Sequence, residues 1–136
     1  MTTLLDTGLL VAYLYRGDTH HDWVTQQAEE LSPPLYSCEA VLSEAHFLLS
    51  GAPQGTENLL ELLGRDLIRT PFSYADHADR VHELMRAYSD LPMSFADACL
   101  VRMSEIRDDS RVFTVDSDFR VYRRHGTEAI PVLMPD

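Results

Sequence analysis

The sequence contains no lysine: all 11 basic residues are arginine, they face 22 acidic residues, and the net charge is −11. A nucleotide-binding P-loop needs a lysine that reaches the phosphates, so that motif is excluded. Response regulators and haloacid-dehalogenase-type phosphatases use a lysine beside an aspartate, and they are disfavoured for the same reason. The acidic charge also argues against nonspecific nucleic-acid binding through a basic surface.

Cysteine is scarce, and long apolar runs are absent. Cys38 and Cys99 lie far apart and form no CxxC pair, which predicts buried, reduced thiols and neither a disulfide framework nor a zinc site. No segment approaches the roughly 20 apolar residues of a membrane span. The N-terminal segment is interrupted by Asp6 and is unlike a signal peptide. We therefore expect a cytoplasmic protein with no membrane association.

Short apolar segments alternate with longer amphipathic ones along the chain. Strands are expected at residues 2–5, 35–38, 66–71, 111–115 and 129–133, and helices at residues 7–15, 20–31, 39–49, 56–63, 74–88 and 94–106. This alternation is typical of an α/β domain with a mainly parallel sheet. Because no repeat or linker interrupts it, residues 1–136 are expected to form one domain.

Two acidic residues directly follow expected strands, where ligands of parallel sheets gather. Asp6 ends the first strand and Asp116 ends the strand at 111–115. Asp6 and Asp118, two residues after Asp116, also have structural explanations. Asp6 is well placed to cap the next helix, and an Asx-type turn would explain Asp118. Capping and a role in chemistry are compatible, because a carboxylate has two oxygens.

Two further acidic residues lie on expected helices. Glu44 shares a helix face with Val41 and Phe47, which predicts a carboxylate on an apolar stripe; the alternative is a glutamate at the edge of the stripe that reaches solvent. Asp97 forms a capping-box-like pair with Ser94, and it also points toward the apolar side of its helix. Four carboxylates that converge would repel one another unless a cation neutralises them. Oxygen ligands without histidine or cysteine favour magnesium or manganese.

Four segments, in this order, carry a resemblance to a known family: LLDTGLLVAYL, SCEAVLSEAHFLL, SFADACLV and VFTVDSDF. The chain resembles the PIN-domain family, and within it the VapC-type toxins of toxin–antitoxin pairs. Carried over residue by residue, the family's acidic quartet falls on Asp6, Glu44, Asp97 and Asp116. Thr114 and Asp118 match its accessory positions.

The resemblance implies a three-layer α/β/α sandwich with a mainly parallel five-stranded sheet. It also implies a Mg²⁺- or Mn²⁺-dependent endoribonuclease that hydrolyses RNA with a metal-activated water. Asp6, Asp97 and Asp116 would bind the metal, and Glu44 would either bind it or orient and deprotonate the water. Toxins of this type form homodimers and are bound by a cognate antitoxin protein that inserts a segment along the active-site groove.

The charge of the chain leaves other functions open. Removing the four candidate acids from −11 still leaves −7. Arg111, Arg120, Arg123 and Arg124 are close in sequence, so they would either bind RNA phosphates or form an ordinary solvated face. One alternative is a non-catalytic PIN-like module whose acidic pocket binds a basic partner peptide. Another is a phosphodiesterase that acts on DNA or on general substrates.

Overall fold

The computed structural model describes residues 1–136, the whole sequence. Its elements, in chain order, are β1 (Thr2–Leu5), α1 (Thr7–Leu14), α2 (His21–Glu29), β2 (Leu35–Tyr36), α3 (Glu39–Leu49), α4 (Gly55–Gly64), β3 (Ile68–Arg69), α5 (Tyr74–Ala87), α6 (Phe95–Ile106), β4 (Ser110–Phe113), the 3₁₀ helix η1 (Ser117–Arg120), β5 (Arg123–Arg124), β6 (Glu128–Ala129) and β7 (Val132–Leu133). No helix is long and apolar enough to cross a membrane.

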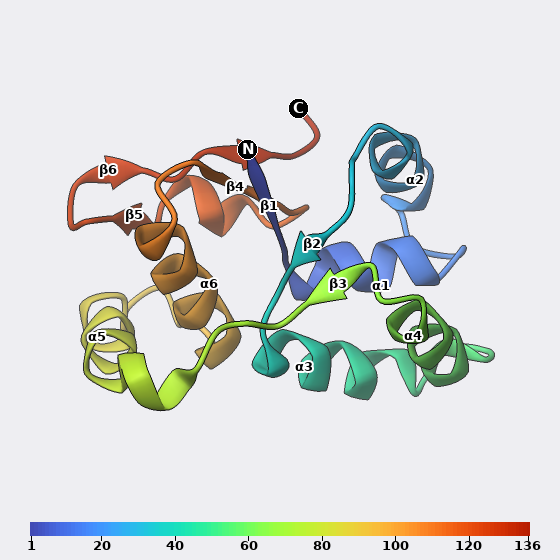
Figure 1. Ribbon diagram of the computed structural model, residues 1–136, viewed down its shortest axis with the longest axis horizontal. Helices are drawn as coiled ribbons and strands as arrows, with labels where there is room; N and C mark the ends of the chain where they lie inside the picture. The colour runs from blue at the N-terminus through green and yellow to red at the C-terminus, as the bar shows by residue number, and fades with distance from the viewer.

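Five strands form one sheet in the order β3-β2-β1-β4-β7, and every neighbouring pair is parallel. The chain first builds the sheet outward from β1 through β2 to β3, then crosses to the other side of β1 to add β4 and β7 (Figure 1). The strand order therefore reverses between β1 and β4. In open parallel sheets, the crevice outside the carboxyl ends of such a pair is where ligands bind.

Helices cover both faces of the sheet, as the alternation of side chains along β1 requires. Leu4 contributes to a cavity lined by Met103 and Ile106 of α6. The next residue, Leu5, faces the opposite side and lines a cavity with Leu9 of α1. Helices α5 and α6 pack side by side at one end of the molecule, and α3 crosses below the carboxyl ends of the strands (Figure 1). The α/β/α sandwich with a parallel five-stranded sheet is confirmed.

The C-terminal region differs from the prediction of one strand at residues 129–133. Ala129 belongs to β6, which pairs in antiparallel fashion with β5, whereas Val132 and Leu133 form β7 of the main sheet. The β5–β6 hairpin turns through His125 and Gly126, both of which have positive φ. Between β6 and β7, Pro131 has no amide proton for a ladder, but its carbonyl accepts a bond from the Val112 amide at 2.9 Å.

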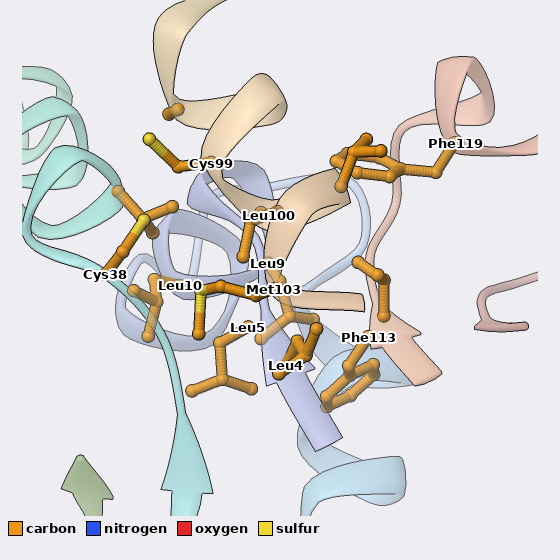
Figure 2. Close-up of a cluster of buried hydrophobic side chains, with 14 of the residues drawn as sticks. Leu4, Leu5, Leu9, Leu10, Cys38, Cys99, Leu100, Met103, Phe113 and Phe119 are labelled. Carbon is orange, nitrogen blue, oxygen red and sulfur yellow. The ribbon is translucent and has the colours of Figure 1, made fainter. Parts of the chain in front are cut away.

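Both cysteines are free and buried, as predicted. Cys38 caps the amino end of α3 and Cys99 lies on α6. Figure 2 shows the two thiols facing each other across the contact between these helices, above the leucines of β1 and α1. The thiols therefore belong to the packing that fixes α3 relative to α6.

Candidate active site at the carboxyl edge of the sheet

Asp6 is held at the junction of β1 and α1 by three contacts. Its amide donates to the carbonyl of Phe113 at 3.3 Å, which extends the pairing with β4 by one residue. Its carboxylate accepts from the Thr7 amide at 2.7 Å and from the Thr114 hydroxyl at 2.7 Å. Asp6 is therefore the N-cap of α1, as expected, and also a buried carboxylate tied to the neighbouring strand.

Asp116 is positioned by the segment that follows β4. The buried Thr114 hydroxyl, which donates to Asp6, also accepts from the Asp116 amide at 2.9 Å. The Asp116 carboxylate then accepts from the Asp118 amide at 2.9 Å and caps η1. The Asx-type turn expected for Asp118 is thus made by Asp116. Thr114 links the Asp6 carboxylate at the end of β1 to the backbone of Asp116 beyond β4.

Asp97 approaches from the first turn of α6. Its amide donates to the Ser94 hydroxyl at 3.0 Å, which confirms the capping contact expected between these residues. Its side chain is half-buried, and one oxygen, Oδ2, accepts from the Tyr122 hydroxyl at 2.8 Å. The serine fixes the backbone of Asp97, and the tyrosine fixes its carboxylate.

The three aspartates influence one another electrostatically. The pKa of Asp6 is raised to about 7, chiefly by burial and also by the charges of Asp97 and Asp116, against the lowering effect of the Thr114 and Thr7 hydrogen bonds. Burial also raises the pKa of Asp97, with Asp116 and Glu44 acting in the same direction against the bond from Tyr122. Proton or cation binding relieves such repulsion.

Glu44 does not lie where its helical pattern predicted. The buried face of α3 is formed by Val41, Ala45 and Leu49, and Glu44 is exposed. The predicted stripe is divided: Val41 is buried, whereas Glu44 and its apolar neighbour Phe47, which is 74% exposed, face outward. Glu44 lies at the rim of a cavity of about 630 Å³, and its charge acts on Asp97. The alternative of a glutamate that reaches solvent is correct.

The predicted arginine cluster is largely used to hold the protein together. Arg124 is buried and donates to the carbonyls of Ser104 and Asp108 and to Glu128. Arg123 donates to three nearby carbonyl groups. Of the remaining two, Arg111 donates to Thr3 at 3.4 Å from within β4, and Arg120 is exposed. These four residues therefore do not form a continuous basic patch.

Tyr122 belongs to this site, although no local pattern in the sequence indicates it. It has no acidic or metal-ligating side chain, and its contact with Asp97 joins positions 25 residues apart. Asp118, predicted as an accessory residue, is half-buried near this tyrosine, and its charge raises the pKa of Tyr122 after burial and the bond to Asp97. Only the folded chain shows which hydroxyl meets which carboxylate.

Comparisons with known proteins identify the fold. No protein-family model matches the chain, and no curated protein gives a significant match to its sequence. Among solved structures, the chain is similar to VapC20 of Mycobacterium tuberculosis, a toxin that cleaves the sarcin–ricin loop. The TM-score is 0.78 at 19% sequence identity, and the match covers 96% of this chain and 100% of the other. The protein has the PIN-like fold of the VapC toxins.

Proposed function

We propose that the protein is a Mg²⁺- or Mn²⁺-dependent endoribonuclease and the toxin of a toxin–antitoxin pair. The observation that carries the proposal is the electrostatic effect of Asp97 and Asp116 on the buried Asp6 at the point where the strand order of the sheet reverses. The similarity to a toxin that cleaves an RNA loop supports the choice of RNA over DNA as substrate.

The residues at this site fit a hard divalent cation. Their ligand atoms are carboxylate oxygens, and the hydroxyl of Thr7, next to Asp6, is buried without a hydrogen-bond partner. No three His, Cys, Asp or Glu side chains converge closely enough to enclose an ion by themselves, so an ion bound here would keep several water ligands. Asp6, Asp97 and Asp116 would hold the ion. Once bound, it would lower the pKa of water and stabilise charge at the phosphate.

The other side chains would prepare this site for hydrolysis. The Thr114 hydroxyl and the Thr7 amide hold the Asp6 carboxylate in one orientation. The carboxylate would therefore need little reorganisation when the reaction takes place. Glu44, exposed at the cavity rim, would orient the attacking water and accept its proton. Asp118 would support this arrangement as an accessory residue. Attack by water would leave a 5′-phosphate and a 3′-hydroxyl.

We also propose a homodimer and a cognate antitoxin as partners in the cytoplasm. Helix α3 exposes Phe47 and Leu48, at 74% and 51%, and Phe95 of α6 is 40% exposed on the same cavity as Phe47. Apolar surface of this kind on a small domain is typical of an interface. An antitoxin arginine would find a charge-complementary receptor in the three aspartates.

A second function is favoured by the charge of the chain. With a net charge of −11 and Arg123 and Arg124 engaged internally, the surface is better suited to a basic peptide than to a polyanion. A non-catalytic module that binds such a peptide would need no metal. It would bind the peptide tightly and show no Mg²⁺ or Mn²⁺ binding.

The test of the proposed function is RNA cleavage by purified protein with Mg²⁺, with Mn²⁺ and with EDTA. The substrates are an RNA that contains a sarcin–ricin-type loop and a DNA of the same sequence. Asp6→Asn and Asp97→Asn should abolish cleavage, whereas Asp79→Asn, on the exposed surface of α5, should leave it unchanged. Cleavage by Asp97→Asn at the wild-type rate would rule out the proposal. Cleavage of the DNA but not of the RNA would mean that the enzyme is a deoxyribonuclease.

A further inference from the structure

Tyr122 is a buried side chain whose hydroxyl donates one hydrogen bond. The residue is 0% exposed, and its hydroxyl donates to Asp97 Oδ2 at 2.8 Å. Its ring is fixed by edge contacts with Tyr88 and Phe119, both with ring centroids 5.2 Å away. Since the ring cannot turn without disturbing two other aromatic side chains, the direction of the hydroxyl is fixed as well.

Packing alone does not explain a tyrosine at this position. A phenylalanine would fill nearly the same volume without the cost of burying a hydroxyl. The Tyr122 hydroxyl donates its only proton to the Asp97 carboxylate. A hydrogen bond to a charged acceptor is stronger than one between neutral groups. The hydroxyl of Tyr122 therefore holds the Asp97 carboxylate in place through a strong hydrogen bond.

The contact leaves the other oxygen of Asp97 available. Oδ2 accepts from the Tyr122 hydroxyl, so Oδ1 is the oxygen left for a cation; the Ser94 hydroxyl also acts on this carboxylate and lowers its pKa. The segment that carries the tyrosine also carries Asp116. The Tyr122 amide donates to the carbonyl of Asp118 at 3.0 Å, and the Asp118 amide donates to the Asp116 carboxylate. One compact turn therefore sets the positions of Asp116 and of the hydroxyl that holds Asp97.

We propose that Tyr122 is a positioning residue that holds Asp97 as a one-oxygen ligand for the divalent cation. The inference rests on the proposed function, because it assigns a task within the same metal site. Residues that orient a metal ligand from behind change metal affinity or activity by about 10- to 100-fold when they are lost. Tyr122 would act in this way through Asp97 and would not touch the RNA.

The test compares Tyr122→Phe with Tyr88→Phe. Both remove one hydroxyl from the same aromatic cluster, but the Tyr88 hydroxyl accepts from the Arg123 amide at 2.8 Å and touches no acidic residue. Mn²⁺ binding is measured by isothermal titration calorimetry, and RNA cleavage is measured over a range of Mn²⁺ concentrations. Near-ultraviolet circular dichroism establishes that both variants keep their tertiary structure.

We expect Tyr122→Phe to weaken Mn²⁺ binding by about 10- to 100-fold, with cleavage recovering toward the wild-type rate at saturating Mn²⁺. Tyr88→Phe should bind Mn²⁺ as the wild type does. Equal Mn²⁺ affinity in the two variants would overturn the positioning role and leave the proposed function standing. The same conclusion would follow if Tyr122→Phe lost RNA cleavage but bound Mn²⁺ as tightly as the wild type. Absence of Mn²⁺ binding by the wild-type protein would overturn both.

Discussion

The buried carboxylate of Asp6 should make the protein less stable at alkaline pH when no divalent cation is bound. Its pKa is raised from 3.8 to about 7, chiefly by burial, so the folded state holds a proton that the unfolded state releases above pH 3.8. The stabilising contribution of that proton is full below pH 3.8 and is lost as the pH rises through 7. At about 1.4 kcal/mol per pKa unit, the loss is about 4 kcal/mol.

Asp6→Asn removes this effect, because the amide is uncharged at every pH. An asparagine accepts one of the two hydrogen bonds from Thr7 and Thr114 and donates in place of the other, at a cost of about 1 kcal/mol. In EDTA we therefore expect the variant to be more stable than the wild type by about 3 kcal/mol at pH 8.5, with the advantage lost at pH 4.

Urea unfolding at the two pH values measures both free energies. The fluorescence of Trp23, whose ring packs edge-on against Phe113 with centroids 5.8 Å apart, reports the transition. Asp79→Asn serves as the control, since it removes an exposed carboxylate. Adding Mn²⁺ at about 100 times its dissociation constant should stabilise the wild type by about 2.7 kcal/mol. A stability difference between Asp6→Asn and wild type that is the same at both pH values would refute the reasoning.

Three further changes test the scaffold around the site. Glu105→Ala should destabilise the protein by about 3–5 kcal/mol in thermal unfolding. The Glu105 carboxylate is buried between Arg80 and Arg102 and accepts bonds of 2.9 and 2.6 Å from Arg80. A loss below about 1 kcal/mol would show that Arg80 and Glu105 behave as a surface ion pair. Phe47→Asp should convert the proposed dimer to a monomer by light scattering without lowering thermal stability, and an unchanged mass would exclude α3 from the interface. Gly55→Ala should cost about 1–3 kcal/mol, since a Cβ there would clash with the carbonyl oxygen of the last residue of α3. An unchanged free energy of unfolding would mean that the α3–α4 connection shifts freely.

The central strands and most helices follow from local patterns. The segment at residues 2–5 is apolar and ends in a capping aspartate, and the structure places β1 there. The helix predicted at residues 39–49 has the same bounds as α3. Hydrophobic periodicity defines these elements because each must bury one side. The order of the strands depends on which helices they pack against, and it is not contained in any local pattern.

Two features of the site, the exposure of Glu44 and the contact of Tyr122, depend on packing between distant segments. The pattern around Glu44 shows that α3 has apolar residues on more than one side, but it cannot say which side the rest of the chain covers. The structure covers Val41 and leaves Phe47 exposed. Tyr122 lacked a signal because its partner, Asp97, is distant in sequence. Contacts of this kind exist only after α6 and the turn behind η1 have packed together.

The register of β1 against β4 ties the site to the core. Leu5 stands opposite Phe113, so the next residues, Asp6 and Thr114, meet at 2.7 Å. A slip of one residue would move the strands by about 3.3 Å and turn every side chain to the opposite face. Cleavage activity should therefore report on how well these two strands are aligned. A screen for inactive variants would then recover apolar substitutions in β1 and β4 alongside changes to the acidic residues, in protein that is still folded.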